Sequence, residues 1–345
     1  MKKILLLLMC ACLLFSLAAC GESESPEETN TVKGWDPAVD HKVIMDDSAT
    51  KILIADLDMG DDPANIDISK CIIWEWDTEK ATGAKIKGQK VTMDEAGFRY
   101  STCWKRQVVI FCGSGGWVGA VDYMTKEVLF EDNPGNGPHS VEMLPNGDMV
   151  VACSGNSNSA NGKVLYYELS KGKNKPSASL DLDSAHGICW DPTNEVIWVL
   201  GGQEIIACTA ADGKLTKISG MGLNLSDGGG HDLSPVYGHP GLYWVSTGSR
   251  LFLFDGNENT LTDSMSLSAK YWGVKVKGIA WFPDGSMILT ADDQGGTGTY
   301  RSSQFRILYP SAKNEDGTYL LTDIMIPHRK GSQTYKIHVF SEDYH

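Results

Sequence analysis

Three histidines and one lysine recur at a nearly constant interval along the chain, and together their side chains could carry chemistry. His139, His186 and His231 lie 47 and 45 residues apart, and Lys277 follows 46 residues later. Imidazoles donate hydrogen bonds to anionic ligands beside Lys or Arg, and neutral imidazoles also bind divalent metals. The series therefore predicts a ligand site wherever the fold brings these four positions together.

The interval is the length of a repeated unit of four short strands. In the reference copy, a Pro-Asn-Gly turn separates two apolar runs and its proline follows His139 by six residues; copies that begin at His186 and Lys277 keep this spacing. A third and a weaker fourth apolar run follow each pair. Four β-rich runs per unit, bounded by Gly, Asn, Asp and Pro, are typical of the blades of a β-propeller, which must stack on one another to bury a core.

We predict an all-β, six-bladed β-propeller over residues 51–345, closed by the C-terminal strand. Five units begin at Arg99, His139, His186, His231 and Lys277. The sixth would join a first strand at 335–340 to second, third and fourth strands at 52–57, 72–76 and 91–93. Such closure removes the open edges of the ring. Seven blades are the alternative, with the extra unit in 291–332.

The first strand of each propeller blade lines the central channel, and every second side chain points to the axis. The equivalent positions would therefore surround one mouth as a hub of Arg99, His139, His186, His231, Lys277 and Tyr335. The loop residues predicted around its rim are Asp61, Asp62, Trp117, Asn156, Gln203, Arg250, Trp272 and Asp292. Of these, Trp117 and Trp272 are expected to be exposed for stacking on a sugar ring.

Two chemistries fit the hub, and a purely structural ring is the alternative to both. Repulsion from Arg99 and Lys277 should keep the histidines mostly neutral in an empty site. We favour hydrogen bonding to an anion such as a carboxylated saccharide, which should bind more tightly towards pH 6 as the histidines protonate. The alternative is a divalent metal on His139, His186 and His231; no other cofactor is predicted.

Residues 1–19 resemble the signal peptide of a bacterial lipoprotein. Lys2 and Lys3 precede an apolar run, and Leu17-Ala-Ala-Cys20 resembles the lipobox, whose cysteine is lipidated and becomes the mature N-terminus. Residues 20–50 are interpreted as the lipidated Cys20 and a flexible acidic linker. We therefore expect a lipid-anchored protein of the outer membrane, in its periplasmic or its surface leaflet, with the bilayer as one partner.

Composition bears on further partners and on the cysteines. Without Lys2 and Lys3 the chain would carry 28 basic against 44 acidic side chains, a net charge of about −16, which excludes nucleic acid as a plausible ligand. The six cysteines beyond Cys20 show no CxxC or Cys/His metal spacing, and we predict buried thiols, with disulfides as the alternative. They are Cys71, Cys103, Cys112, Cys153, Cys189 and Cys208.

The chain resembles the uncharacterised six-bladed propeller lipoproteins of Gram-negative bacteria. The resemblance rests on its Pro-Asn-Gly and Pro-Asp-Gly turns and on histidines that occupy the same position in successive repeats. Some polysaccharide lyases with propeller folds also use hub histidines, in some cases with a metal, but none of their longer motifs occurs here, so no catalytic residue is assigned. We predict a binding protein for a small polar or anionic ligand, a saccharide by analogy with that lipoprotein class. The alternatives are a polysaccharide lyase or hydrolase and a protein-interaction platform.

Overall fold

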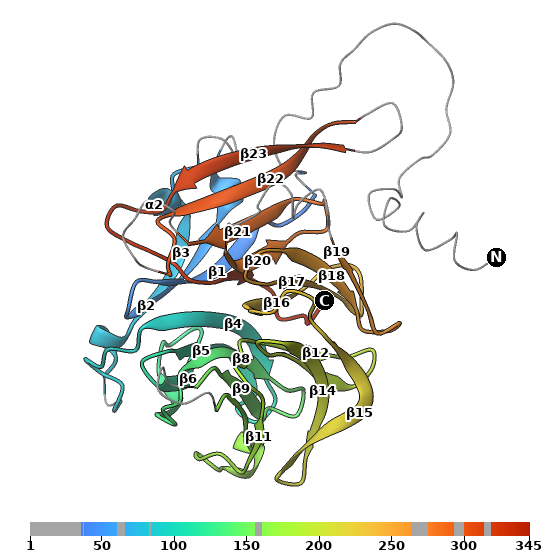
Figure 1. The fold of residues 1–345 in the computed structure, drawn as a ribbon. Helices are drawn as coiled ribbons and strands as arrows, with labels where there is room; N and C mark the ends of the chain where they lie inside the picture. The colour runs from blue at the N-terminus through green and yellow to red at the C-terminus, as the bar shows by residue number, and fades with distance from the viewer. Residues whose placement is uncertain are drawn as a thin grey trace, which may run out of the picture.

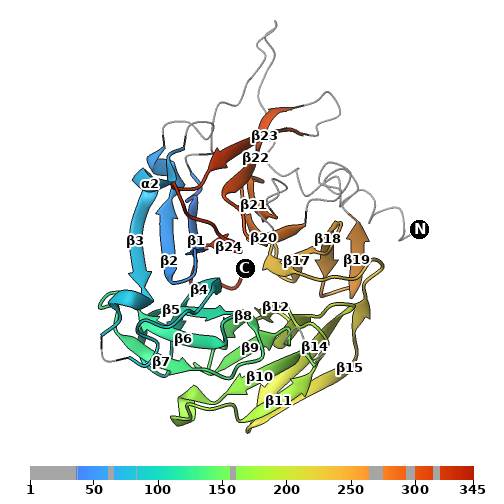
Figure 2. The same cartoon turned by 60° about the vertical axis from the view of Figure 1, so that its left-hand side comes forward.

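The computed structural model describes residues 36, 38–60, 66–82, 84–155, 161–263, 275–292, 300–313 and 319–345. In these residues, six antiparallel sheets of four strands each stand around a central axis, with the C-terminus near that axis (Figures 1 and 2). The predicted all-β, six-bladed propeller is confirmed. No helix of the described residues is long and apolar enough to cross a membrane.

The strands follow one another in chain order, apart from the strand that closes the ring. The first blade contains β24 (Ile337–Val339), β1 (Lys42–Asp47), β2 (Lys51–Asp56) and β3 (Ile72–Asp77). The second contains β4 (Met93–Ser101), β5 (Arg106–Gly113), β6 (Trp117–Asp122) and β7 (Val128–Asp132). The third contains β8 (Pro138–Met143), β9 (Met149–Cys153), β10 (Lys163–Tyr167) and β11 (Ala178–Asp181).

The other three blades repeat this order. The fourth contains β12 (Gly187–Asp191), β13 (Val196–Leu200), β14 (Glu204–Ala211) and β15 (Lys214–Asn224). The fifth contains β16 (Asp232–Pro235), β17 (Leu242–Ser246), β18 (Leu251–Asp255) and β19 (Thr260–Asp263). The sixth contains β20 (Val276–Trp281), β21 (Met287–Ala291), β22 (Gln304–Lys313) and β23 (Tyr319–Pro327). Short helices interrupt the connections at η1 (Leu57–Met59), α2 (Ile68–Cys71), η3 (Thr78–Lys80) and η4 (Leu169–Lys171).

The turns between inner and second strands explain why the repeat was visible in the sequence. In the third blade Gly147 has a φ of 85° and its amide donates to the carbonyl of Leu144, and in the sixth blade Gly285 has a φ of 86° and donates to Phe282. Glycine adopts positive φ without a steric penalty, so the Pro-Asn-Gly and Pro-Asp-Gly sequences start the second strand at the same point in each unit.

The C-terminal strand closes the ring as predicted, but the composition of the first blade differs from the prediction. β24 pairs antiparallel with β1, with His338 opposite Ile44. The second strand is β1, so the runs at 52–57 and 72–76 form the third and fourth strands, and 91–93 leads into β4 instead. The propeller thus begins before residue 51, at Lys42. β1 was missed because its apolar core, Val43 to Met45, is only three residues long and is flanked by charges.

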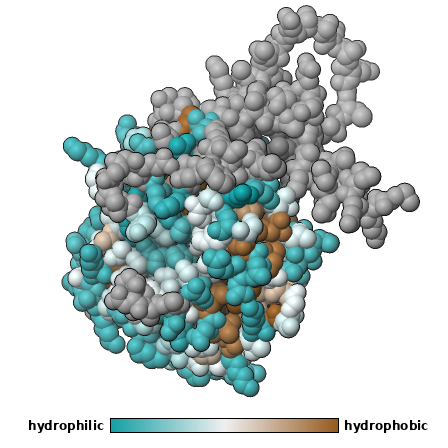
Figure 3. All heavy atoms as spheres, in the orientation of Figure 1, coloured by the Kyte–Doolittle hydropathy of each residue, from teal (hydrophilic) through white to brown (hydrophobic). Residues whose placement is uncertain are grey.

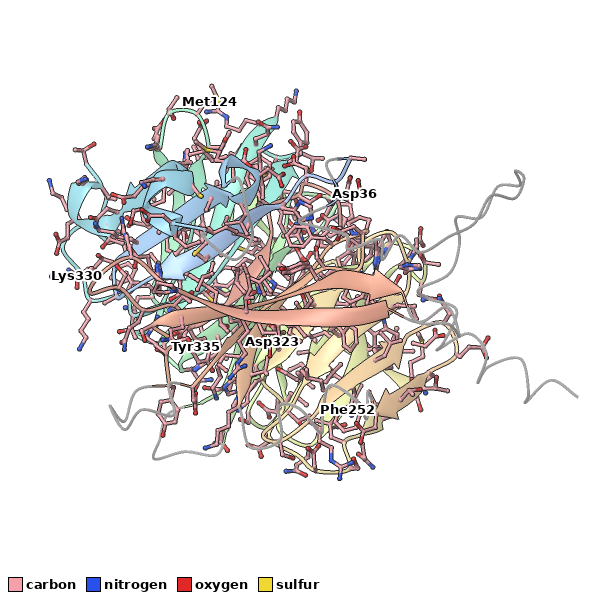
Figure 4. The ribbon with its side chains drawn as sticks, turned by 90° about the horizontal axis from the view of Figure 1, so that it is seen from above. Asp36, Met124, Phe252, Asp323, Lys330 and Tyr335 are labelled. Atoms are coloured by element: carbon pink, nitrogen blue, oxygen red, sulfur yellow. The ribbon has the colours of Figure 1, made fainter. Side chains whose placement is uncertain are left out.

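The stretch after residue 290 holds the outer half of the sixth blade, because its described residues form β22 and β23 and add no further unit. In Figure 1 these two strands form a long hairpin that extends beyond the neighbouring blades. Figure 4 shows the same strands from above, where they run across the molecule. The seven-bladed alternative is therefore wrong.

Apolar side chains from facing sheets fill the spaces between the blades, while the visible surface is mostly hydrophilic with one apolar band (Figure 3). Trp74, Trp76, Trp198 and Trp244 are buried there. Five of the six cysteines are buried, Cys103 is partly exposed, and all six are free thiols. Cys112 and Cys153 lie in one cluster between the second and third blades, which is how small apolar residues behave.

Candidate functional site

The hub opens into a cavity of about 570 Å³ at one end of the channel. Five of the six predicted hub residues line it: His139, His186, His231, Lys277 and Tyr335. The ring centroids of His139 and His186 are 4.4 Å apart, and those of His186 and His231 are 5.5 Å apart. Tyr335, labelled in Figure 4, lies 5.9 Å from His139 between ring centroids. Residues that recur at a regular interval in the sequence therefore lie next to one another around the mouth of the channel.

β-Bulges set several of these side chains at the mouth. The register of β8 with β9 shifts between Pro138 and Ser140, so His139 is the extra residue, and the same shift in β20 makes Lys277 the extra residue. A bulge re-aims the side chain of its extra residue away from the regular alternation of the strand. His186 and His231 precede β12 and β16 directly. Residues at equal spacing thus reach the same level of the channel.

Arg99 is not part of this mouth, and its prediction as a hub residue is wrong. In β4 the shift falls between Met93 and Glu95, so Asp94 is the residue equivalent to His139. Asp94 lines the cavity, whereas Arg99 lies five residues further along the same nine-residue strand. The sequence held the signal, because Asp94 precedes His139 by 45 residues. An acid in a series of basic residues was not recognised as the same position.

Hydrogen bonds to the backbone assign the tautomers of His139 and His186. Nδ1 of His139 lies 2.8 Å from the carbonyl oxygen of Gly137, and Nδ1 of His186 lies 2.9 Å from that of Ser184. A carbonyl oxygen only accepts, so each Nδ1 carries a proton, and in the neutral form of either ring Nε2 has the lone pair. In the described part of the chain, Nε2 of His186 has no hydrogen-bond partner, and that of His139 lies 4.0 Å from Oδ2 of Asp94. In its neutral form each ring therefore offers a hydrogen-bond acceptor at the cavity.

His231 and Lys277 form a second pair with the opposite polarity. Nζ of Lys277 lies 3.0 Å from Nε2 of His231 and 3.5 Å from Oδ1 of Asp292. Burial, followed by the charge of Lys277, lowers the pKa of His231 to about 3, and burial next to His139 places the pKa of His186 well below its ordinary value. The ring of His231 is therefore neutral at pH 6 and accepts from Lys277, and burial favours the neutral form of His186.

Sequence reasoning missed two residues that complete the cavity wall. Arg301 donates to Oδ2 of Asp46 at 2.5 Å and to Oδ1 of Asp94 at 2.7 Å, which joins the sixth blade to the first and second. Tyr300 is 68% exposed, and its ring centroid lies 5.7 Å from Nζ of Lys277. Both residues belong to the connection between β21 and β22, which is longer than the connection between the second and third strands of any other blade. The repeat therefore held no signal for them.

The predicted rim is only partly found at the cavity. Asp292 contacts Lys277, as described, but Trp117 packs against the apolar cluster between the first and second blades and is no exposed platform. The exposed aromatic side chain at the mouth is Tyr300. Gln203 and Arg250 do not line the cavity, and Arg250 donates to Asp263 at 2.6 Å. The remaining predicted residues lie outside the described part of the chain: Cys20, Asp61, Asp62, Asn156 and Trp272.

Below the cavity, a buried ion network crosses the channel. Nζ of Lys336, whose side chain is 0% exposed, lies 2.7 Å from Glu95, 3.2 Å from Asp232 and 2.8 Å from the carbonyl oxygen of His186. Burial would lower the pKa of Lys336, but Glu95 and Asp232 raise it; burial would raise the pKa of Glu95, but Lys336 and His338 hold it at about 2. This network is charged and joins four blades.

Metal binding finds little support in these geometries. Glu95, Asp232 and His338 place ligand atoms within 4.8 Å of one another, but the ammonium group of Lys336 already forms ion pairs with both acids. The other such group among the described residues consists of the surface acids Asp40, Asp56 and Asp58. The nitrogens of His139, His186 and His231 do not meet this distance, and Nε2 of His231 accepts from Lys277.

The other end of the channel is covered by the last residues of the chain. Nε and Nη2 of Arg99 each donate to a different oxygen of Glu142 at 2.8 Å, and Nη1 donates to the carbonyl of Ser341 at 3.0 Å. The ring of Tyr344 lies 4.7 Å from the Arg99 guanidinium carbon, and its hydroxyl donates to the carbonyl of Met143. Residues 340–345 and this ion pair make up what we call the closed end.

The sequence matches a family described as a family of unknown function, DUF6528, over residues 1–320. Among curated proteins, none matches the chain. A protein of unknown function from Bacteroides caccae is similar in structure, with a TM-score of 0.51 at 13% identity, covering 87% of this chain and 98% of that one. A chain of a nidogen/laminin complex has a TM-score of 0.53 at 9% identity, covering 88% and 99%. These likenesses concern the fold.

Proposed function

The chain belongs to the DUF6528 family, whose function is unknown, and we propose that it binds a small acidic saccharide in the hub cavity. The observation that carries the proposal is the placement of acceptors beside a cation. Nε2 of His139 and His186 face ligand hydroxyls as acceptors, while Lys277, donating to His231, supplies a positive charge. Sugars carry many hydroxyl donors, and an acidic sugar adds the carboxylate that an ammonium group binds.

The shape and polarity of the cavity support the same class of ligand. A volume of about 570 Å³ lies in the range of small-molecule sites, and a few polar groups converge on it. The exposed ring of Tyr300 stands at the mouth, where an aromatic face packs against the apolar face of a sugar. Lys275, which is exposed, adds a second cation at the same mouth, and this favours an acidic over a neutral saccharide.

Calorimetry with uronate-containing oligosaccharides tests the proposal, with neutral oligosaccharides of the same length as matched ligands. Acidic ligands should bind and neutral ones should bind at least tenfold more weakly, with no change when a chelator is added. Binding that disappears with the chelator would replace the saccharide site by a metal site, and release of shortened products would make the protein a lyase or hydrolase. No binding of any glycan would leave the histidine ring as structure.

The subcellular location is part of the proposal, and it rests only on the resemblance of residues 1–19 to a lipoprotein signal peptide. We propose that Cys20 is lipidated and anchors the propeller to the outer membrane, which would present the hub cavity to saccharides outside the cytoplasm. Cys20→Ser should shift the protein from the detergent phase to the aqueous phase on detergent partitioning, because the acylated thiol is lost. Unchanged partitioning would exclude the lipid anchor and leave the cavity proposal intact.

A further inference from the structure

Lys277 differs from the other buried lysine of the channel in what surrounds its amine. Its side chain is 3% exposed, yet it lines the open hub cavity. The nearest polar atom in the described structure is the neutral Nε2 of His231 at 3.0 Å, and the carboxylate of Asp292 stands off at 3.5 Å. Lys336, in contrast, is held by two carboxylates and a carbonyl and is shut off below the cavity.

This environment weakens the hold of Lys277 on its proton. Burial lowers the pKa of Lys277 to about 8, Asp292 opposes the shift, and the charges of Lys275 and Lys336 add to it. Tyr300 and Tyr335 face the amine with their rings and bring no negative charge. Desolvation and neighbouring cations are the conditions that turn a lysine into a nucleophile near neutral pH. An amine with this access and these neighbours is poised to attack a ligand.

We propose that Lys277 forms a reversible imine with a small acid that carries an aldehyde or keto group, such as a 2-oxo acid, in the hub cavity. The inference deepens the proposed function, on which it rests for the carboxylate preference of the site. The neutral amine attacks the carbonyl carbon, and a proton moves from nitrogen to the resulting alkoxide. The hydroxyl of this carbinolamine then leaves as water after protonation, and the nitrogen becomes a protonated imine. Ammonium and carbonyl thus give iminium and water, without oxidant or reductant.

The neighbours of Lys277 suit this sequence of steps. Nε2 of His231 lies at hydrogen-bond distance from the amine and accepts a hydrogen bond from it, which orients the amine while its proton passes to the alkoxide. Asp292 lies close enough to stabilise the iminium charge, and Lys275 at the same mouth attracts the carboxylate of the ligand. The iminium keeps the positive charge of Lys277, so a carboxylate remains favourable in the covalent complex.

Reductive trapping tests the inference on the intact protein. Glyoxylate with cyanoborohydride converts an imine to a stable secondary amine, and tandem mass spectrometry assigns the modified lysine. At pH 7, Lys277 should be modified at least tenfold faster than the exposed Lys275, which serves as the control in the same molecule, and the rate should rise towards pH 8 and then level. Lys277→Arg, which keeps the charge, should remove this adduct without lowering the thermal midpoint.

Modification of Lys277 at or below the rate of Lys275 would overturn the inference, and so would an adduct distribution that follows exposure alone. The trapping is measured beside calorimetry with the acidic oligosaccharides on the same preparation. Saccharide binding without trapping at Lys277 would refute only the imine. Trapping without saccharide binding would keep the reactive amine and refute the saccharide as ligand. Failure of both would return the cavity to a structural role.

Discussion

The two ends of the propeller channel contain similar residue types in opposite states. At the closed end, the guanidinium group of Arg99 is bonded to both oxygens of Glu142 and to the backbone of Ser341, under the ring of Tyr344. At the hub cavity, Nε2 of His186 has no hydrogen-bond partner among the described residues, and Nζ of Lys277 donates to the imidazole of His231. At the first end the charged groups of Arg99 and Glu142 are paired within the protein, whereas at the second end Nε2 of His186 has no partner among the described residues.

This difference separates polar residues that hold the fold from polar residues that are available for binding. Buried polar groups are almost always hydrogen-bonded, so incomplete pairing beside an open cavity points to a function. The Lys336 network lies between the two ends and belongs to the structural class, because both of its acids are paired and also accept from backbone amides of neighbouring blades. Substitutions should therefore separate stability from binding along the channel axis.

The largest effect is expected for Lys336→Met. Removing the ammonium leaves Glu95 and Asp232 buried without their shared cation, and breaking a buried ion pair in this way destabilises by about 3–5 kcal/mol. The free energy of unfolding from urea titration should fall by this amount. Lys275→Met, which removes an exposed lysine, is the matched control and should change it by less than about 0.5 kcal/mol. A stable Lys336→Met variant would mean that the network does not join the blades.

Acid should destabilise the same network at a defined pH. The folded pKa of Glu95 is about 2, below its ordinary value of 4.5, so its contribution to stability is present above pH 4.5 and is lost as the pH falls towards 2. The thermal midpoint should drop across this window. Glu95→Gln should start from a lower midpoint and show a shallower drop. An equally steep drop in the variant would assign the acid sensitivity to other carboxylates.

Alkaline pH should weaken ligand binding at the hub cavity, and this is the smallest of the three expected effects. The pKa of Lys277 is about 8 in the empty cavity, so the affinity for an acidic saccharide should be nearly constant from pH 6 to 7 and fall by up to tenfold per pH unit above 8. The tightening towards pH 6 expected from the sequence is not retained for His186 and His231, whose pKa values lie too low. Calorimetry from pH 6 to 9.5 measures this; a flat profile would remove Lys277 from the site.

The repeat made the fold and most of the hub predictable, because turns at fixed spacing place His139, His186, His231 and Lys277 at one level of six similar blades. Features that depart from the repeat could not be predicted this way. The connection that carries Tyr300 and Arg301 is longer than its counterparts in the other blades. Arg99 was predicted in place of Asp94 because the long inner strand β4 offers several candidate positions. Whether a polar side chain is satisfied or left open depends on partners from distant blades, which the local sequence does not encode.

The most direct test of the account compares Lys277→Met with Arg99→Met, one cation from each end of the channel. Affinity for the same acidic oligosaccharide is measured by calorimetry at pH 7, and stability by urea titration. Lys277→Met should weaken binding at least tenfold, since removing one member of a buried charge pair costs about 2–5 kcal/mol, and should leave the fold as stable as before. Arg99→Met should bind normally and lose about 3 kcal/mol of stability. The reverse pattern would show that the two ends have been assigned the wrong roles.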